Sequence, residues 1–288
     1  MTAAPAPGTQ EWARKVSASK VAAILGLSPW DSPRSMWHAM RCELPWAEES
    51  RPMRRGNMLE NAILDWWLAD NPEWVEVQRQ PVYSLDDWCL ATPDMEVEHR
   101  ETGERMLIDA KTTGTDMDWS DEPPAYYVAS SMWQLAMAPK IQRVCLATLF
   151  GKPFDMRSFY VERNDELIGR IIDRCREFYE SLSADTPPEL DDHPATYEAL
   201  RKLHPDIDRD ATADLTPAEA AEYVTAEAAF KAAETRAKAA RAVVLERMGR
   251  ARLAVCEGRT VARRQPNRYG VSLVPVAKAI DTEGETAA

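Results

Sequence analysis

The sequence predicts an α/β fold in which helices flank a mixed central β-sheet on both sides, with a helical C-terminal appendage. Strand-like stretches within residues 75–113 and 143–162 show the period of two that is typical of half-buried strands, and they alternate with stretches of helical period. A proline-rich acidic break at 186–194 precedes an alanine-rich segment, 216–249, that is longer than an ordinary globular helix. We therefore expect a globular core followed by an arm.

The composition is that of a soluble globular protein. Of the 288 residues, 45% are hydrophobic and 28% charged, which is ordinary for this class. No apolar run approaches the roughly 18–20 residues that a membrane helix needs, so we expect no membrane partner. The five cysteines are odd in number and show no C-x-x-C spacing. This argues for a reducing cytoplasm and against a disulfide framework or a cysteine zinc site.

The net charge of −12 is distributed unevenly along the chain. Residues 185–227 hold twelve Asp and Glu against three Lys and Arg, whereas residues 247–268 hold seven Arg against one Glu. Proteins that bind the DNA backbone are usually basic. The total charge argues against nucleic acid, but it is a poor guide to any one surface.

Three helices are expected before the first strand. Serine residues can cap the first helix, Pro33 stands in the first turn of the second, and the third carries one apolar stripe. Two more helices flank the last pair of strands, and Pro139 ends the first of these two. The five expected helices are residues 16–30, 33–40, 54–69, 125–138 and 164–182.

Six strands are expected in the core. The turn sequence ETGE, with Gly103, predicts a hairpin between the third and fourth strands. The expected strands are residues 75–84, 88–92, 95–99, 105–113, 143–151 and 156–162.

The domain boundaries follow from composition. We expect a disordered lead at 1–11, a core at 12–185 and an acidic linker at 186–215. The remainder, 216–288, should contain a long helix or helical hairpin and a small β-hairpin.

Four charged side chains interrupt apolar stretches of the core. In LIDAKTT (107–113), Asp109 and Lys111 lie two apart on a predicted strand and so share one face. Asp94 follows a strand and a proline, and Glu60 shares a helical face with apolar residues. Buried acids need a compensating positive charge. Their oxygens suit Mg²⁺ or Mn²⁺, and such an ion can activate water for attack at a phosphate.

Each of these residues has a simpler interpretation when taken alone. Glu60 would be a solvated helix acid, Asp94 a turn residue, and Asp109 with Lys111 an ion pair on an edge strand. The order G-x-x-x-E, then P-D, then D-x-K in a hairpin is much rarer jointly. It favours one site that holds one or two divalent ions.

Pro93-Asp94 with Asp109-Ala110-Lys111 resembles the PD-(D/E)xK nuclease signature, with Asp where Glu often stands. Five blocks in chain order narrow the resemblance: SASKVAAILGLSPWDSP, RGNMLENAILDWW, ATPDMEV, LIDAKTT and YYVASSMWQLAMA. They resemble the YqaJ-type phage recombination nucleases, relatives of the lambda-type alkaline exonuclease, over about residues 12–182.

The resemblance implies a restriction-endonuclease-like core that resects double-stranded DNA ends 5′→3′ and leaves 3′ single strands, in the cytoplasm of a bacterial host cell. It suggests a single-strand annealing protein as partner and a homo-oligomer as assembly. By this resemblance, Glu60, Asp94 and Asp109 bind the metal together with the carbonyl of Ala110, and Lys111 is the catalytic lysine.

Two further residues match positions that contact the substrate in the family. Gln134 resembles the glutamine that helps to hold the substrate near the scissile phosphate, and Ser19 resembles the serine that contacts the 5′ phosphate. The related exonuclease has an arginine before that serine. In this chain Trp12 stands at the position that aligns with this arginine without a gap. Arg14 and Lys15 are the basic residues nearby that could contact the 5′ phosphate instead.

The glutamine motif also departs from the Q-x-x-x-Y form, because Ala138 stands at the tyrosine position. Tyr127, two turns before Gln134 on the same helical face, is the alternative. Trp30 and Trp37 could stack on DNA bases, although aromatic residues at such spacings are more often part of a core.

Two other functions stay open. The same core could be an endonuclease or a structure-specific nuclease, and a covalently closed duplex would distinguish it from an exonuclease, which needs an end. It could also be a non-catalytic DNA-binding scaffold. Competent residues at all four positions, Glu60, Asp94, Asp109 and Lys111, argue against the scaffold.

Overall fold

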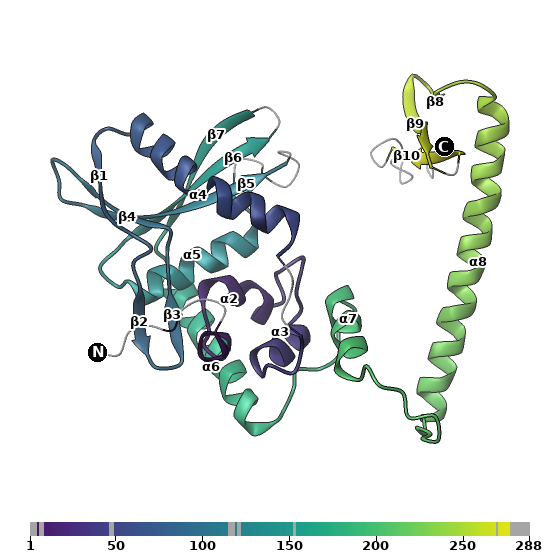
Figure 1. The fold of residues 1–288 in the computed structure, drawn as a ribbon, viewed down its shortest axis with the longest axis horizontal. Coiled ribbons are helices and arrows are strands. Elements are labelled where there is room, and N and C mark those ends of the chain that lie inside the picture. Colours follow the sequence, from purple (N-terminus) through teal and green to yellow (C-terminus); the bar gives the residue numbers. More distant parts are fainter. Residues whose placement is uncertain are drawn as a thin grey trace, which may run out of the picture. The chain divides into compact units, whose positions relative to one another are not determined.

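The structure is a computed structural model that describes residues 5, 9–45, 49–114, 119, 122–151, 154–268 and 270–276. The chain divides into two compact units, Met1–Ile207 and Asp208–Ala288, which are described separately (Figure 1). Most of the predicted disordered lead, 1–11, lies outside the described residues.

A five-stranded mixed sheet, with the strand order β1-β4-β5-β6-β7, forms the centre of the first unit. Strands β5 and β6 run parallel, and the other neighbours are antiparallel. The strands are β1 (Trp74–Arg79), β4 (Met95–His99), β5 (Arg105–Thr113), β6 (Arg143–Gly151) and β7 (Phe154–Glu162). The predicted α/β class with a mixed central sheet is confirmed.

The β4–β5 hairpin has the predicted ends. Met95 lies opposite Ile108, and the turn contains Gly103 at φ +67°, a left-handed conformation that favours glycine. Successive residues of β5 then point to opposite faces of the sheet. Ile108 packs with one hydrophobic cluster and Leu107 with the other, so Asp109 and Lys111 share the face of Leu107.

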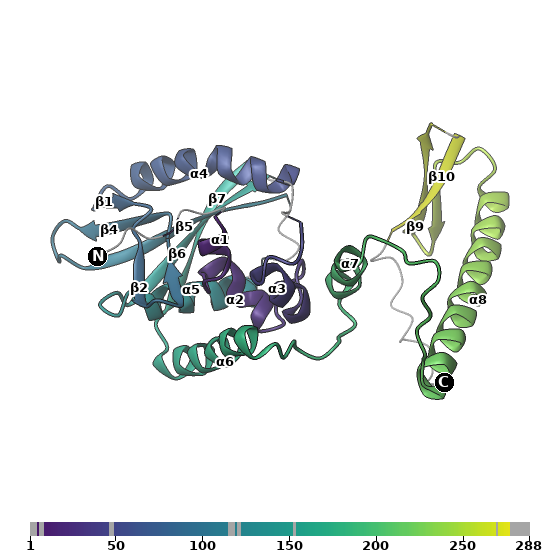
Figure 2. The ribbon, with the colours of Figure 1, turned by 60° about the horizontal axis from the view of Figure 1, so that its bottom comes forward.

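Helices cover both faces of this sheet, as Figures 1 and 2 show. Helix α4 (Arg51–Asp70) buries Ile63, Leu64 and Trp67 against the face that carries Ile108. Helix α5 (Ala125–Met137) packs against the opposite face, and α6 (Asp165–Ala184) packs on α5 and belongs to the same hydrophobic cluster. The predicted flanking of the sheet by helices is confirmed.

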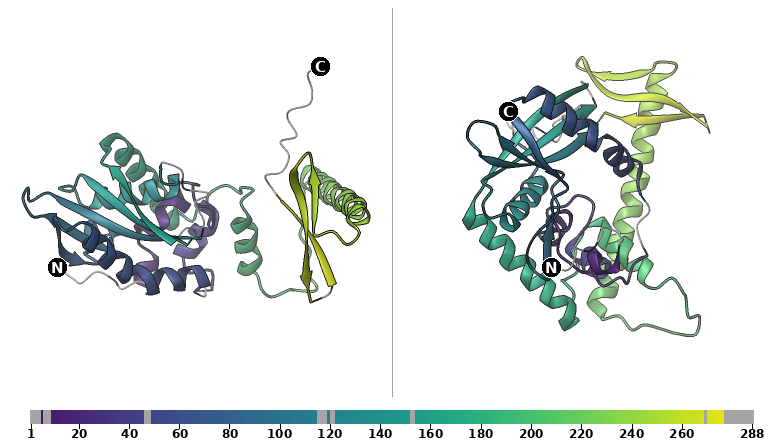
Figure 3. Two further views of the ribbon diagram at one scale, coloured as in Figure 1. Left: turned by 90° about the horizontal axis from the view of Figure 1, so that it is seen from above. Right: turned by 60° about the vertical axis from the view of Figure 1, so that its left-hand side comes forward.

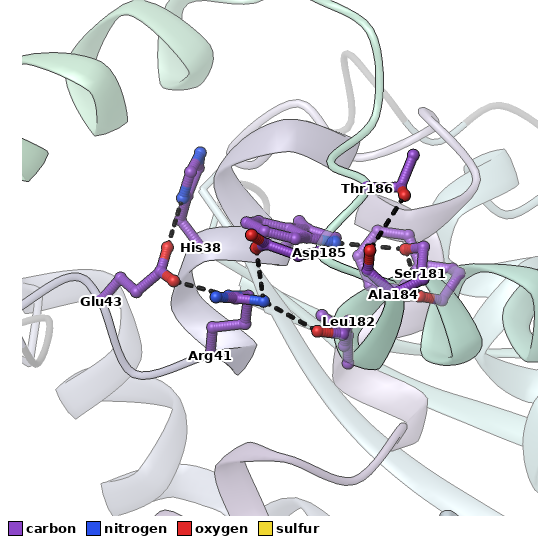
Figure 4. Close-up of polar contacts among 10 residues, drawn as sticks. His38, Arg41, Glu43, Ser181, Leu182, Ala184, Asp185 and Thr186 are labelled. Carbon is purple, nitrogen blue, oxygen red and sulfur yellow. Dashed lines mark hydrogen bonds and ion pairs between the residues drawn. The ribbon is translucent and has the colours of Figure 1, made fainter.

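Three short helices precede α4. They are α1 (Gln10–Ala13), α2 (Ala18–Ile24) and α3 (Pro33–Met40). Helix α2 packs against α5 and α3. A polar network ties the end of α3 to the end of α6 (Figure 4): Arg41 donates to the Leu182 carbonyl at 2.8 Å and pairs with Asp185 at 2.9 Å and Glu43 at 2.5 Å.

The prediction of one strand over 75–84 is wrong. Strand β1 ends at Arg79, and β2 (Tyr83–Asp86) pairs with β3 (Cys89–Ala91) in a separate two-stranded sheet. The break lies at Gln80, whose φ of +48° is left-handed, and at Pro81, which has no backbone N–H to donate to a ladder.

The segment expected to be an acidic linker, 186–215, contains helix α7 (Pro194–Leu203). This helix packs on α3, and the hydroxyls of Thr196 and Ser32 lie 2.6 Å apart. Thr196 and Ala199 are buried. The first unit therefore extends to Ile207, beyond the predicted boundary at residue 185.

The second unit contains one continuous helix, α8 (Pro217–Met248), so the helical hairpin that was considered is not formed. Thr216 and Glu219 form a capping box at its start. Strands β8 (Leu253–Cys256), β9 (Arg259–Asn267) and β10 (Gly270–Pro275) form a three-stranded antiparallel sheet instead of the predicted hairpin (Figure 3). No helix in the described ranges has the length and apolarity to cross a membrane.

Candidate active site

The predicted acids and lysine gather around the β4–β5 hairpin. Asp94 directly precedes β4, whereas Asp109 and Lys111 lie in the second half of β5. Asp109 is buried, and Lys111 is partly buried. Strand β5 is an inner strand of the sheet, and two residues of α5, Gln134 and Tyr127, lie against Asp109 and Lys111 on its polar face.

Asp109 is held from two elements at once. Its Oδ2 lies 2.5 Å from Nζ of Lys111, and its Oδ1 accepts a hydrogen bond from Nε2 of Gln134 on α5 at 3.1 Å. Lys111 also donates to the carbonyl oxygen of Ala110 at 3.3 Å. Both carboxylate oxygens are therefore oriented, which is how a preorganised site fixes its charges.

Asp94 is tied to the neighbouring strand. Its Oδ2 accepts a hydrogen bond from the backbone N–H of Ala110 at 2.7 Å. Burial raises the pKa of Asp94 to about 8, and the charges of Asp109 and Glu60 add to this effect, while Lys111 opposes it. Without a further cation, this carboxyl group is therefore mostly protonated at neutral pH.

Lys111 keeps its charge. Burial alone would lower its pKa, but the carboxylates of Asp109 and Asp94 raise the pKa of Lys111 above its ordinary value. Its Nζ also lies 5.5 Å from the ring centroid of Tyr127 on α5. The lysine can therefore act as a charged hydrogen-bond donor and not as a general base.

Glu60 reaches this neighbourhood from α4, on the other face of the sheet. It is half-buried, and its Oε1 accepts a hydrogen bond from Nε2 of Gln80 at 3.1 Å. Its charge contributes to the raised pKa of Asp94. The charge of Glu60 thus acts on Asp94, although the hydrogen bond from Gln80 keeps the Glu60 carboxylate at the rim of the site.

Within the described ranges, no three His, Cys, Asp or Glu side chains gather closely enough to hold a metal ion. Glu60, Asp94 and Asp109 do not converge on one point in this arrangement. The physical reason is visible in their contacts: the ammonium of Lys111 binds both Asp109 and the carbonyl of Ala110, two of the predicted ligands. Their role as metal ligands stays a prediction.

The chemistry of the site nevertheless fits a divalent ion. Asp94 and Asp109 lie around one ammonium, and the charge of Glu60 acts on Asp94, so the fully ionised site has a negative surplus. Carboxylate and carbonyl oxygens are the hard donors that Mg²⁺ and Mn²⁺ prefer. Oε1 of Gln134 is buried and has no hydrogen-bond partner among the described residues, which leaves one more oxygen free to face a cation or its water.

Of the predicted DNA-contacting residues, Gln134 and Tyr127 lie at the site and three others lie in the N-terminal block. Ser19 is exposed on α2, with its Oγ 3.1 Å from that of Ser17. Arg14 is exposed at the end of α1, and Lys15 donates to the carbonyl of Asp87 at 2.6 Å. Their contact with a phosphate stays a prediction.

The sequence reasoning missed Lys20, which organises this N-terminal block. Its buried Nζ donates to the carbonyl oxygens of Trp12, Ala13 and Lys15 at 2.9, 2.7 and 2.6 Å, and so binds the C-terminal end of α1. Burial lowers the pKa of Lys20 to about 7. A lysine inside the apolar run KVAAI was the available signal, because a buried lysine needs acceptors.

Comparison with known proteins assigns the segment that carries this site. Residues 10–140 match the family described as YqaJ-like viral recombinase domain. This segment is therefore similar to YqaJ-like viral recombinase domains. Glu60, Asp94, Asp109, Lys111 and Gln134 all lie within it. The matched segment ends before β6, so the match does not include α6, α7 or the second unit.

Relatives of this YqaJ-like domain occur among curated and solved proteins. The uncharacterized protein YqaJ of Bacillus subtilis (strain 168) is 27% identical over 214 residues, which are 70% of this chain and 64% of that protein. An alkaline exonuclease (LHK-Exo) from Laribacter hongkongensis is 20% identical, with a TM-score of 0.47, over 62% of this chain and 94% of that one. A phage-related exonuclease from Haemophilus somnus 129PT is 12% identical, with a TM-score of 0.47, over 59% and 96%.

Proposed function

We propose that the YqaJ-like domain is a metal-dependent deoxyribonuclease that resects duplex DNA ends 5′→3′ and leaves 3′ single strands for phage-type recombination. One observation carries the proposal: a charged lysine, Lys111, lies between a buried acid and a backbone carbonyl on a strand that Gln134 and Asp94 hold from both sides. The family description, a viral recombinase domain, supports the DNA substrate.

In this proposal the chain binds the ion through Asp94, Asp109 and the carbonyl of Ala110, with Glu60 at the rim. A bound Mg²⁺ or Mn²⁺, as one or two ions, would supply a water of lowered pKa and polarise the phosphate. The protein's part is to place these oxygens before the substrate arrives. The hydrogen bond from Ala110 N–H to Asp94 and that from Gln134 to Asp109 do so.

Lys111 then binds the scissile phosphate. Its ammonium can donate to a non-bridging phosphate oxygen, where negative charge develops as phosphorus is attacked. In the ion-free site Asp109 and Asp94 hold the pKa of Lys111 above its ordinary value, so the lysine is a charged donor before the ion and the substrate bind. The α5 helix covers the lysine and limits the water that would screen this interaction.

The preference for DNA ends rests on the N-terminal block. We propose Ser19, with Arg14 and Lys15, as the group that contacts a 5′ phosphate, and Tyr127 as a residue that lines the strand path next to Lys111. A single-strand annealing protein and a homo-oligomer remain the proposed partners, and the bacterial cytoplasm the proposed location. An endonuclease or structure-specific nuclease on the same core is the alternative.

One experiment tests the activity. Linear duplex labelled at its ends, with a 5′ phosphate or a 5′ hydroxyl, is incubated with wild type, Lys111→Ala or the exposed control Lys140→Ala, in Mg²⁺ or EDTA. In Mg²⁺, we expect wild type and the control to shorten each strand from its 5′ end. We expect no shortening with Lys111→Ala, or with any variant in EDTA. Intact linear duplex with wild type in Mg²⁺ would overturn the proposal. Cleavage of a closed circle would favour the endonuclease.

A further inference from the structure

Trp30 is the most exposed tryptophan among the described residues, with 63% of its surface accessible. It lies in the loop between α2 and α3. Trp37, one helix further on, is 2% exposed and donates from Nε1 to Ser181, so it belongs to the core. The sequence offered Trp30 and Trp37 alike as candidates for stacking on DNA bases, but the structure places the first at the surface and the second in the core.

The exposed ring is held in place. The backbone N–H groups of Trp30 and Asp31 both donate to Oγ of Ser28 at 3.1 Å, which fixes the turn. The ring packs against Tyr126 of α5 with 5.1 Å between centroids and an interplanar angle of 74°. An edge-to-face contact of this kind stabilises the ring and leaves much of its surface free.

A chain of rings connects Trp30 with the proposed catalytic lysine. Tyr126 and Tyr127 have centroids 4.5 Å apart, and Nζ of Lys111 lies 5.5 Å from the ring of Tyr127. Consecutive nucleotides of one strand of B-DNA rise by about 3.4 Å. Trp30 is therefore within a few nucleotides of a phosphate bound at Lys111.

Trp30 also lines a cavity of about 960 Å³ that Ser19, Lys20 and Asp31 line too. Its volume lies at the upper end of the roughly 300–1,000 Å³ that is usual for small-molecule sites. Trp30 thus shares this cavity with Ser19 and contacts Tyr126 of α5, the helix whose Tyr127 lies near Lys111. Besides the acids Asp31 and Glu198, the wall here includes the aromatic residues Trp12 and Trp30 and the basic residue Lys202. Aromatic rings beside positive charge are typical of sites that bind unstacked nucleotides.

We propose that Trp30 is a stacking platform for an unpaired nucleobase of the DNA strand under cleavage, within a few nucleotides of the scissile phosphate. The proposal rests on the proposed nuclease function and adds a base-binding site to it. Every base has a π-face, so this contact does not select a sequence. It positions the strand, and we expect its loss to weaken DNA binding on the order of 10- to 100-fold.

The test compares wild type with Trp30→Ala, Trp30→Phe and the control Tyr197→Ala, which removes an aromatic side chain that is 65% exposed on α7. Steady-state cleavage of linear duplex in Mg²⁺ gives KM and kcat. In EDTA, the fluorescence of 2-aminopurine placed at each of the first few positions from the 5′ end reports stacking. Thermal melting shows whether each variant is folded.

We expect Trp30→Ala to raise KM about 10- to 100-fold with kcat within about threefold of wild type, because a stacking contact of this size contributes to binding. It should also lose the 2-aminopurine quenching that wild type shows. Trp30→Phe should keep most of both signals, and Tyr197→Ala all of both.

An unchanged KM and unchanged quenching in Trp30→Ala would overturn the stacking site while wild type still cleaves, and so leave the nuclease function intact. A lowered melting temperature in Trp30→Ala, with an equal defect in Trp30→Phe, would assign the residue a structural role and also overturn the site. If wild type does not cleave DNA at all, the nuclease proposal fails first and this one with it.

Discussion

Nζ of Lys111 lies 2.5 Å from Oδ2 of Asp109, its neighbour on the same face of β5. Burial of the lysine would lower its pKa, but Asp109, with Asp94 as the next contributor, raises that pKa above the ordinary value. Asp109 therefore sets the charge state of the residue that we propose to bind the scissile phosphate. In the proposed function, the D-x-K spacing would therefore serve to keep Lys111 charged as well as to bind a metal ion.

Asp109→Asn should abolish most of the nuclease activity while it preserves the shape of the site. The amide removes a charged ligand from the proposed ion and the partner that keeps Lys111 protonated, so we expect kcat to fall on the order of 100- to 1,000-fold. The measurement is steady-state cleavage of end-labelled duplex in Mg²⁺.

Glu98→Gln provides the matched control for Asp109→Asn. Glu98 lies on β4 of the same hairpin and pairs with Arg105 at 3.0 Å, at a position that is 38% exposed. We expect its cleavage rate to remain within about twofold of wild type, because exposed ion pairs contribute little. A wild-type rate in Asp109→Asn would show that the chemistry does not depend on this strand.

The hairpin that carries this pair could be predicted from the sequence because its information is local. The period of two, the turn at Gly103 and the apolar residues around Asp109 are all encoded within about twenty residues. The contact between Asp109 and Gln134 spans 25 positions and depends on how α5 crosses the sheet. A motif indicated that both residues matter, but only the packing shows that they touch.

Mg²⁺ binding should strengthen as the pH rises towards 8 and then level off. Burial raises the pKa of Asp94 to about 8, and an ion must displace this proton to use the carboxylate. Below that pH we expect the apparent affinity to change by about tenfold per pH unit. Calorimetry at pH 7 in two buffers of different ionisation enthalpy should show release of about one proton per site.

The raised pKa of Asp94 also determines how the stability of the ion-free protein changes with pH. The folded protein holds the Asp94 proton more tightly than the unfolded chain, whose carboxyl has the ordinary value near 3.8. The ion-free protein should therefore lose stability as the pH rises from about 4 through about 8, and Mg²⁺ should remove this loss. Asp94→Asn should abolish both the pH dependence and the proton release. If wild type binds Mg²⁺ equally well at pH 6 and pH 8, Asp94 is not a ligand.

Lys20→Met should destabilise the fold, because it leaves three backbone carbonyl oxygens at the end of α1 without their donor. We expect the free energy of unfolding to fall by about 3 kcal/mol, since a buried carbonyl oxygen left without a donor costs about 1–3 kcal/mol and neighbouring losses are not additive. Urea unfolding followed by circular dichroism measures this change. The exposed Lys140→Met should change stability by less than about 0.5 kcal/mol.

The residues that sequence reasoning missed share a dependence on distant parts of the chain. Lys20 is explained by carbonyls of α1, whose short helix has no strong periodicity of its own. Helix α7 is polar over most of its surface and buries only Thr196 and Ala199, so its pattern resembles that of a solvated linker. The break at Gln80 did have a local signal in Pro81, which cannot donate to a β-ladder, but the pairing of β1 with β4 and of β2 with β3 depends on distant parts of the chain.

Truncation should locate the end of the core at Ile207 and not at residue 185. A chain that ends at Ile207 keeps α7, with the contact between Ser32 and Thr196 and the bond from Arg34 to the carbonyl of Pro188, and should melt within about 3 °C of the first transition of the full chain.

A chain that ends at residue 185 loses α7 and exposes its contact face on α3, and we expect its free energy of unfolding to be about 2 kcal/mol lower. Differential scanning calorimetry of the two truncated chains and the full chain provides the comparison, and cleavage of linear duplex tests whether the shortened cores keep the site. Equal melting temperatures for the two truncations would show that α7 does not stabilise the core. A chain ending at Ile207 that fails to fold would show that the core requires the second unit, contrary to the division of the chain into two compact units.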